Sequence, residues 1–234
     1  MTDTVPVVIP ARGGSKGIPR KNLRRLGEKP LVAHQIASAL EAESVGTPVV
    51  STDDEEIAAA AEEYGAEVPF TRPDALATDD VPVIAVVEHF LEHCLDTGVD
   101  PAYVLCLQPT SPFTTAAQID AAVEKARSTR CDSVVSVTKV TDTHPYRAYR
   151  MADDRVEPLP FTEEVPDQRQ DRPDVYGFTG AIYLRQPNLL LDWDHDDFAL
   201  GTDVRGIVQE GKSAVEIDTE FQLTLARALL AYQD

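Results

Sequence analysis

Apolar runs without polar alternation recur along the chain, and most are separated by segments with apolar residues at helical spacing. The run Val5–Ile9 is apolar throughout and mostly β-branched, which is typical of a strand buried on both faces of a sheet. Similar runs predict further strands at Pro48–Thr52, Ala66–Phe70, Tyr103–Leu107, Ser133–Val137 and Gly180–Arg185.

Helical spacing predicts the elements between these strands. Pro30 suits a first helical turn, and apolar residues follow it at Leu31, Ile36, Ala39 and Leu40. Further helices are predicted at Glu55–Tyr64, Pro82–Leu95, Ala116–Ser128 and Thr219–Tyr232. This order predicts a three-layer, Rossmann-like α/β fold with a mostly parallel sheet and ligands beyond the carboxyl ends of its strands.

The alternation stops at Thr138–Tyr176, a segment rich in Pro, Asp and Arg that shows little periodicity. We predict one domain over residues 1–234, into which residues 138–176 are inserted as an arm. The stretch "THPYRAYR" adds aromatic and arginine side chains, which are typical of an interface. The alternative is a flap that folds back on its own chain.

Composition bears on where the protein works. The chain of 234 residues has no run of eighteen apolar residues, which argues against a membrane span, and its start, "MTDTVPVVIP", does not have the regions of a signal peptide. Cys94, Cys106 and Cys131 are far apart and lack metal-ligand spacing, as expected of reduced core thiols. These features predict a soluble, cytoplasmic protein without disulfides.

The formal net charge is −19, from 21 basic and 40 acidic residues. Such acidity makes nucleic acid and anionic membranes poor partners. Acids such as Asp53, Asp54, Glu55 and Glu56 are interpreted as part of a solvated surface. We hypothesise a halophilic origin, because a high-salt cytoplasm would screen the repulsion between these charges.

One segment departs from this acidity. Between Thr4 and Gly27 there is no acid, and the basic residues are Arg12, Lys16, Arg20, Lys21, Arg24 and Arg25. The stretch "ARGGSKG" follows the first strand, and its glycines would allow positive φ, so that backbone N–H groups converge on an anion. Its spacing is neither that of a Walker loop nor G-x-G-x-x-G. We predict a site for a nucleoside triphosphate; a glycine-rich turn with solvated cations is the alternative.

Several motifs then appear in a fixed order: "IPARGGSKGIPRKN", "VVSTDDEEIA", "RPDALATD", "LQPTSP", "SVVSV", "RQDRPDVYGFTGAIYL" and "EIDTE". Together they resemble the CMP-N-acylneuraminate (sialic acid) cytidylyltransferase family over almost the whole chain. The resemblance implies a nucleotidyltransferase fold and transfer of CMP from CTP to the anomeric hydroxyl of a nonulosonic sugar acid, with release of pyrophosphate. It also implies a homodimer, with the arm pairing two subunits and reaching toward the partner's active site.

The same resemblance assigns roles to individual residues. Arg12, Lys16 and Lys21 would be catalytic and hold the phosphates. The nucleotide-binding set would be Ala11, Arg12, Gly13, Gly14, Lys16, Asn22 and Arg72. Gln108, Ser111 and Arg169 would contact the sugar acid. Simpler alternatives are a loop salt bridge for Arg72 and a strand-end tie for Gln108.

A divalent metal, Mg²⁺ or Mn²⁺, is implied as the cofactor. Glu216 and Asp218 lie two residues apart, so on an extended segment both carboxylates point to the same face. Oxygen ligands of this kind suit Mg²⁺. By resemblance Asp218 is the main ligand and a catalytic residue, and Glu216 assists in place of the family's usual Asp. The alternative is that Asp218 or Thr219 caps the last helix.

Departures from the family's pattern leave the substrates partly open. Pro82 and Val83 stand where the family usually has Ser or Thr near the cytosine, so recognition of the base would fall on backbone groups and Asn22, and the nucleotide is left open. Thr114 replaces an Arg after "PTSP", and Thr179 replaces an Asn before Gly180. The acceptor could therefore be legionaminate, pseudaminate or another keto-deoxy acid. A nucleotide-binding homologue without turnover, or an enzyme for another nucleotide, are further alternatives.

Two other groups of residues offer weaker chemistry. His89 and His93 are four residues apart on a predicted helix, a spacing that suits zinc, but no third ligand is apparent. The acidic stretch Asp194–Asp197 is interpreted as a solvated loop rather than a cation site.

Overall fold

The computed structural model describes residues 4–141, 144–160, 166, 168–193 and 197–232. A six-stranded sheet with the order β10-β6-β9-β5-β1-β4 lies at its centre. Its strands are β1 (Val7–Pro10), β4 (Val49–Ser51), β5 (Val104–Leu107), β6 (Ser133–Lys139), β9 (Tyr176–Arg185) and β10 (Val204–Val208). Only β9 is antiparallel to its neighbours, so the prediction of a mostly parallel sheet is confirmed.

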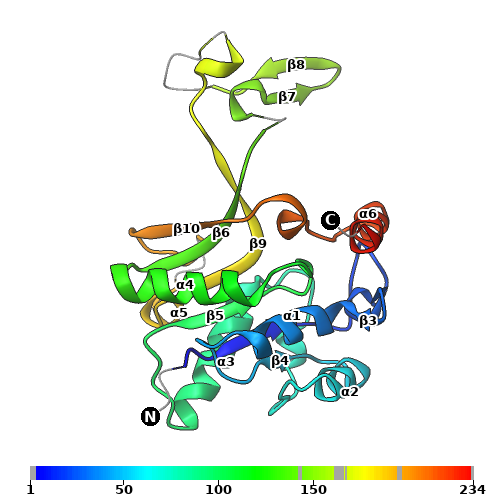
Figure 1. Cartoon of the computed structure of the whole chain (residues 1–234), viewed down its shortest axis with the longest axis vertical. Helices are drawn as coiled ribbons and strands as arrows, with labels where there is room; N and C mark the ends of the chain where they lie inside the picture. Colours follow the sequence, from blue (N-terminus) through cyan, green and yellow to red (C-terminus); the bar gives the residue numbers. More distant parts are fainter. Residues whose placement is uncertain (1–3, 142–143, 161–165, 167, 194–196, 233–234) are drawn as a thin grey trace.

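Helices cover both faces of the sheet, which gives the three layers that the sequence predicts (Figure 1). One face packs against α1 (Leu31–Glu41), α2 (Glu55–Glu63) and α4 (Ala116–Thr129). The opposite face packs against α3 (Val83–Asp96) and the short α5 (Asn188–Leu191). Within β1, Val7 and Ile9 face the first layer and Val8 faces the second, so an uninterrupted apolar run is buried on both sides.

A smaller apolar cluster lies beside the sheet. The final helix, α6 (Glu220–Ala231), packs Leu223 and Ala226 onto Ile18 and Leu26, next to the two-stranded ribbon β2 (Arg25–Leu26) and β3 (Lys29–Pro30). This packing brings the end of the chain against the basic segment near its beginning, so residues about two hundred positions apart in sequence share one cluster.

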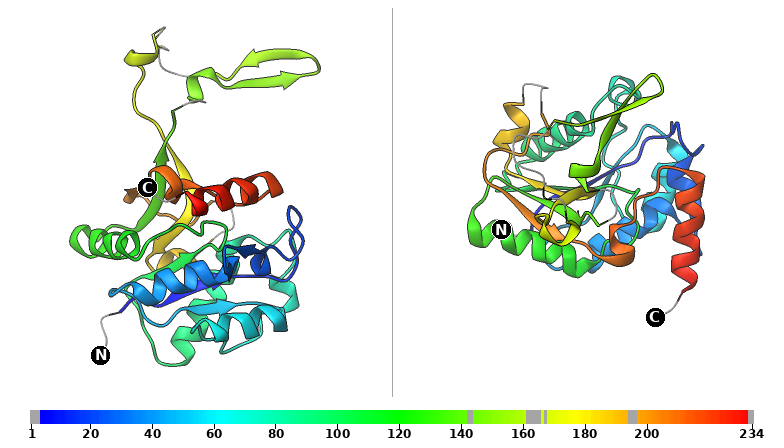
Figure 2. Two further views of the ribbon diagram at one scale, coloured as in Figure 1. Left: turned by 45° about the vertical axis from the view of Figure 1, so that its right-hand side comes forward. Right: turned by 90° about the horizontal axis from the view of Figure 1, so that it is seen from above.

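The segment between β6 and β9 projects away from the sheet (Figures 1 and 2). It carries a hairpin of β7 (Tyr149–Ala152) and β8 (Arg155–Pro158), together with short 3-10 turns at Pro145–Arg147 and Arg169–Asp171. The sequence places an inserted arm at residues 138–176; in the structure residues 138–139 still belong to β6 and residue 176 begins β9, so the projecting segment lies between these two strands.

One predicted strand is wrong, and the strands of two further regions are missed. Ala66–Phe70 is not a strand, because only Glu67 makes an isolated bridge, to Val49, and Pro69 cannot donate a ladder hydrogen bond. Strand β10 is absent from the predicted set, since it is an exposed edge strand that contains Arg205 and Gly206. The β7–β8 hairpin is likewise missed: its apolar side chains Tyr149, Met151 and Val156 lie in two four-residue strands, too short for their alternation to stand out in the sequence.

Within the described part of the chain, no helix is both long enough and apolar enough to span a membrane. The three cysteines are free thiols, and each is buried as expected.

Candidate active site

A cleft of about 490 Å³ lies beyond the carboxyl ends of β1 and β5, where the fold predicts ligands. Among the predicted site residues, its lining includes Arg12, Lys16, Lys21, Asn22, Arg72, Gln108 and Asp218. Residues far apart in sequence are thus brought to one place. The remaining predicted residues, Ala11, Gly13, Gly14, Ser111, Arg169 and Glu216, lie outside this lining.

Two glycines of the basic loop, Gly13 and Gly17, are needed for close approach rather than for unusual backbone angles. Gly13, Gly14 and Gly17 do not adopt positive φ, so that prediction is wrong. A Cβ at Gly13 would lie 2.8 Å from Oδ2 of Asp54, and a Cβ at Gly17 would lie 2.1 Å from the carbonyl oxygen of Asp218. At Gly14 a Cβ would meet nothing within 4 Å.

The acidic turn after β4 holds the basic loop in place. The N–H of Gly13 donates to Oδ1 of Asp53 at 2.9 Å, so it is not free to meet an anion. Asp54 caps α2 by accepting from the N–H groups of Glu56 and Ile57, and it also pairs with Arg20 at 3.1 Å. The interpretation of Asp53 and Asp54 as merely solvated acids is therefore wrong.

Lys21 and Asp218 meet across the cleft, with Nζ and Oδ1 at 2.9 Å. Asp218 is held by its backbone, because its N–H donates to Oε1 of Gln222 and the N–H of Ile217 donates to the carbonyl of Thr110. Thr219, not Asp218, caps α6 through a capping box with Gln222. The side chain of Asp218, 55% exposed, is thus left to face the cleft.

Glu216 lies beside Asp218 but is packed more deeply. Its Oε1 would be 3.0 Å from a Cβ at Gly180. Burial raises the pKa of Glu216, and the charge of Asp218 adds to this effect, whereas Lys21 and Thr110 oppose it. One accessible carboxylate with a second nearby is a donor set that suits Mg²⁺ or Mn²⁺ together with phosphate oxygens.

Two further cleft residues serve the loop and its neighbouring strand. Arg72 is buried and donates to the hydroxyl and carbonyl of Ser51, so it does not form the loop salt bridge of the simpler interpretation. Burial lowers its pKa to about 10, partly offset by the charge of Asp53. Asn22 donates through Nδ2 to the carbonyl of Arg12 at 2.9 Å, which fixes the backbone next to the guanidinium.

Comparison with known proteins identifies the family, since the model described as cytidylyltransferase matches residues 6–184. The chain belongs to the cytidylyltransferase family. It is therefore a nucleotidyltransferase.

Relatives cover nearly the whole chain. CMP-N,N'-diacetyllegionaminic acid synthase of Legionella pneumophila is 35% identical over 95% of this chain and 94% of that protein. Pseudaminic acid cytidylyltransferase of Campylobacter jejuni is 30% identical over 95% and 94%. N-acylneuraminate cytidylyltransferase of Escherichia coli is 32% identical over 97% of this chain but only 52% of its own length.

Solved structures confirm the nucleotidyltransferase fold. CMP:2-keto-3-deoxy-manno-octonic acid synthetase complexed with CTP superposes with a TM-score of 0.73 at 18% identity, covering 97% of this chain and 98% of the other. A 4-diphosphocytidyl-2C-methyl-D-erythritol synthase superposes with a TM-score of 0.71 at 15% identity, covering 98% and 100%.

Three positions expected near the sugar acid turn inward in this cytidylyltransferase. Ser111 is 1% exposed, and its hydroxyl donates to the carbonyl of Thr179. Thr114 bonds to the Ser111 carbonyl and to Gln35, while the Thr179 hydroxyl lies 2.6 Å from Oε1 of Gln209. These side chains support the walls rather than face the cleft, so direct sugar contact by Ser111 is not what the geometry provides.

Two other predicted residues are placed only in part. Ala11 is fully buried, so only its backbone could serve a nucleotide. Arg169 lies in the 3-10 turn of the arm, and its side chain is outside the described part of the structure.

A second cavity, of about 350 Å³, adjoins the cleft and shares Val83 and Gln108 with it. Tyr183, Arg185 and Phe198 line it. The Arg185 guanidinium carbon is 4.7 Å from the centre of the Tyr183 ring, and its N–H groups donate to the carbonyl of Phe198. Sequence reasoning missed this cavity, although an arginine and a tyrosine in the otherwise apolar run "GAIYLR" offered a signal.

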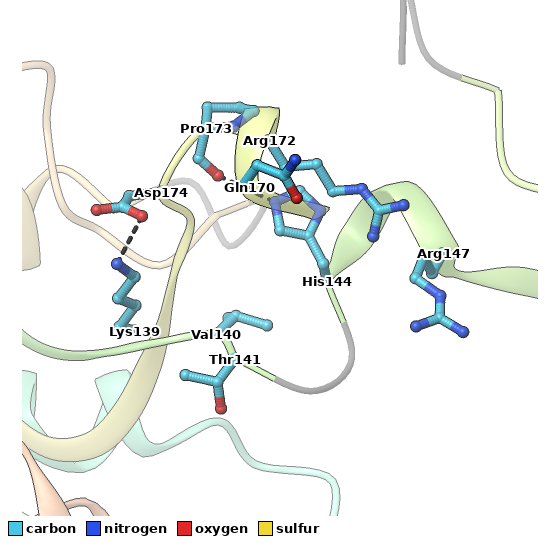
Figure 3. A pocket seen from close by; sticks show the side chains of 9 residues that line it. All are labelled: Lys139, Val140, Thr141, His144, Arg147, Gln170, Arg172, Pro173 and Asp174. Atoms are coloured by element: carbon cyan, nitrogen blue, oxygen red, sulfur yellow. Dashed lines mark hydrogen bonds and ion pairs between the residues drawn. The ribbon is translucent and has the colours of Figure 1, made fainter. Parts of the chain in front are cut away.

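A third cavity, of about 510 Å³, lies in the arm and is bordered by basic side chains (Figure 3). Lys139 pairs with Asp174 at 2.6 Å, and Nε2 of His144 bonds to the carbonyl of Pro173. Arg147 and Arg172 border the same space from two segments of the arm. The arm thus presents a basic hollow in an acidic protein.

The weaker candidate sites find little support. His89 and His93 both contact the ring of Phe70, at centroid distances of 4.8 and 5.0 Å, which indicates packing. Across the described residues, no cluster of three His, Cys, Asp or Glu side chains is placed to hold a metal. Residues 194–196 of the acidic stretch lie outside the described part of the chain.

Proposed function

We propose that the chain transfers CMP from CTP to the anomeric hydroxyl of a nonulosonic, sialic-acid-like sugar acid and releases pyrophosphate. The observation that carries the proposal is the cleft in which Arg12, Lys16 and Lys21 gather opposite Asp218. The names of the relatives support it, because they describe synthases and cytidylyltransferases for legionaminic, neuraminic and pseudaminic acids.

The chain's own residues divide the work by position. Arg12 and Lys16 bind the phosphate tail, and Lys21 lies where it can meet both a phosphate and Asp218. The backbone bonds of Asp218 orient its carboxylate toward the cleft, with Glu216 assisting. Mg²⁺ or Mn²⁺ held there would neutralise charge on the departing pyrophosphate. Asn22 and buried Arg72 lie on the nucleotide side, where base and ribose would be held.

The sugar acid is assigned to the second cavity. It opens beside the cleft at Gln108, so an acceptor held there would lie next to the nucleotide. Its walls combine the aromatic rings of Tyr183 and Phe198 with the buried charge of Arg185, a mixture that suits a carboxylated sugar. Burial lowers the pKa of Arg185, and the neighbouring Cys106, Tyr183 and Asp197 partly oppose this effect.

The active form is proposed to be a homodimer built by the arm. On the arm, Tyr149, Met151 and Val156 are 58%, 65% and 63% exposed, which favours a covering partner. The basic hollow around Arg147 and Arg172 would then supply cations to the partner's acidic substrate, as the resemblance implies for this segment. We further propose a single domain over residues 1–234, a cytoplasmic location and a preference for high salt.

Pyrophosphate release is the direct test. The protein is incubated with each of the four nucleoside triphosphates and Mg²⁺, at high and low salt, with and without a panel of keto-deoxy sugar acids. Release that requires both CTP and one sugar acid supports the transferase and identifies the acceptor. CTP binding without release for any acid favours the alternative of a homologue without turnover, and equal use of another triphosphate contradicts the CTP assignment.

Replacement of Asp218 separates catalysis from binding. Asp218→Ala is expected to abolish pyrophosphate release, because the cleft loses the carboxylate proposed to hold the metal, while CTP binding stays measurable by calorimetry. Asp96→Ala, at the exposed end of α3, serves as a matched charge control. Unchanged turnover in Asp218→Ala would remove this residue from the mechanism.

A further inference from the structure

The side chain of Asp79, from another segment of the chain, bridges two cations of the basic loop. One oxygen of Asp79 lies 2.5 Å from Nη2 of Arg12, and the other lies 3.2 Å from Nζ of Lys16. The second terminal nitrogen of Arg12 donates to the carbonyl of Thr78 at 2.7 Å. The two cations assigned to the phosphate tail are therefore already paired, and one carboxylate pairs with both.

The contacts of Asp79 resemble those that a bound phosphate group would make with Arg12 and Lys16. Each oxygen of Asp79 meets one cation, as two non-bridging oxygens of a phosphate would. The ion pairs are open to water, since the side chains of Arg12, Lys16 and Asp79 are 29%, 72% and 39% exposed. Exposed pairs of this kind are weak and exchange readily. A polyphosphate with several charges can replace a single carboxylate.

The segment that carries Asp79 has few other ties. It runs between the 3-10 turn Asp74–Leu76 and the start of α3, and Thr78 and Asp79 both border the cleft. Within the described part of the chain, the backbone groups of residues 78–80 make no hydrogen bond to other backbone groups. The pairing with the basic loop is thus the main polar attachment of this segment, and losing it leaves the segment free to move aside.

We propose that Asp79 is an internal competitor of pyrophosphate. Its carboxylate holds Arg12 and Lys16 while the cleft has no polyphosphate, yields them to the incoming triphosphate, and takes them back as pyrophosphate leaves. The carboxylate thereby lowers the affinity for both polyphosphates and speeds release of the leaving group. This inference rests on the proposed function, and it involves exchange of ion pairs only, with no covalent step.

Calorimetry with three probes tests the competition. Inorganic pyrophosphate, CTP and CMP are titrated into the wild type, Asp79→Asn, Asp79→Ala and the control Asp80→Asn, which removes the same charge from the neighbouring exposed residue. Asp79→Asn and Asp79→Ala should each bind pyrophosphate and CTP about five- to tenfold more tightly, as expected for removal of two weak competing ion pairs. CMP lacks the β- and γ-phosphates, so its dissociation constant in every variant should stay within about twofold of the wild-type value.

Kinetics supply the second readout. If pyrophosphate leaves more slowly, Asp79→Asn should show stronger product inhibition by pyrophosphate and a kcat that falls together with the KM for CTP. A structural defect would instead raise KM and lower the thermal midpoint. Circular dichroism and thermal melts of each variant check that the fold is kept.

Several outcomes would overturn the inference. Weaker pyrophosphate binding in Asp79→Asn would mean that Asp79 supports the site. An equal gain in pyrophosphate affinity in Asp80→Asn would mean that the effect comes from net charge alone. An equal gain in CMP affinity would mean that Asp79 does not compete with the β- and γ-phosphates. A wild type that binds pyrophosphate but not CTP would contradict the proposed function while the pyrophosphate titrations still decide the role of Asp79.

Discussion

Gly17 lets the basic loop pack directly against the backbone of Asp218. Replacing Gly17 with alanine should therefore disable the enzyme while leaving it folded. An alanine Cβ at this position would lie 2.1 Å from the carbonyl oxygen of Asp218, and atoms of this kind do not approach within 3.0 Å. The two backbones must therefore separate by about 0.9 Å. Asp218 cannot yield freely, because Gln222 holds its N–H and Thr110 holds that of Ile217.

The displacement falls on the residues proposed for chemistry, so its cost should appear in turnover. A misplacement of about 1 Å in an active site lowers rates on the order of a hundredfold. Overpacking of this kind costs about 1–3 kcal/mol of the free energy of unfolding. We therefore expect Gly17→Ala to release pyrophosphate about a hundredfold more slowly while keeping a cooperative urea transition at lower denaturant.

Gly14→Ala is the matched control, because it makes the same change in the same loop where a Cβ would meet nothing within 4 Å. It should retain activity within about threefold of the wild type, in keeping with a substitution that fills open space. Pyrophosphate release and urea unfolding are measured on all three proteins. If Gly17→Ala matched Gly14→Ala in both assays, the reasoning from close approach would be refuted.

Other predictions concern groups outside the loop. Burial raises the pKa of Cys94 and of Cys106 to about 11, so both should resist iodoacetamide at about pH 8 until urea unfolds the chain, and rapid labelling seen by mass spectrometry would contradict this. Hydrogen bonds from the amides of residues 202–203 lower the pKa of Asp132. A lowered folded-state pKa adds stability that is lost as pH falls through it, so urea titrations should show Asp132→Ala approaching the wild type in acid; a constant difference would count against it. Gln108→Ala should raise the KM for the sugar acid more than that for CTP in the pyrophosphate assay, and the reverse would move Gln108 to the nucleotide side.

The sequence predicts those parts of the fold whose residues are buried on both sides. The strands predicted at Tyr103–Leu107 and Ser133–Val137 are confirmed as β5 (Val104–Leu107) and β6 (Ser133–Lys139), because a strand covered by two helical layers is apolar along most of its length. The edge strand Val204–Val208 pairs with only one neighbour and exposes four of its five residues to some degree, so its apolar signal is weak. Ala66–Phe70 has strand-like composition but Pro69 interrupts the ladder.

The site is predictable where a motif fixes the residue type and less so where only the fold decides contact. Arg12, Lys16, Lys21 and Asp218 meet in one cleft as the resemblance implies. Ser111 also stands in one of the family's motifs, "LQPTSP". Its side chain nevertheless turns inward, because its hydroxyl donates to the carbonyl of Thr179 in β9. Whether a side chain in a short loop points into the cleft or into the protein depends on such local hydrogen bonds. A single sequence does not reveal these bonds.

The basic segment that departs from the acidity of the chain is, in the folded protein, largely paired with acids from elsewhere. Arg20 meets Asp54, Lys21 meets Asp218, and Asp79 holds two further cations. A triphosphate approaching a chain of net charge −19 therefore does not find bare cations. It exchanges places with carboxylates, so binding depends on the difference between two sets of ion pairs. Salt screens the long-range repulsion of the nucleotide and weakens the exposed internal pairs together, which gives a physical reason for CTP binding to fall less steeply with salt here than at a cleft of unpaired cations.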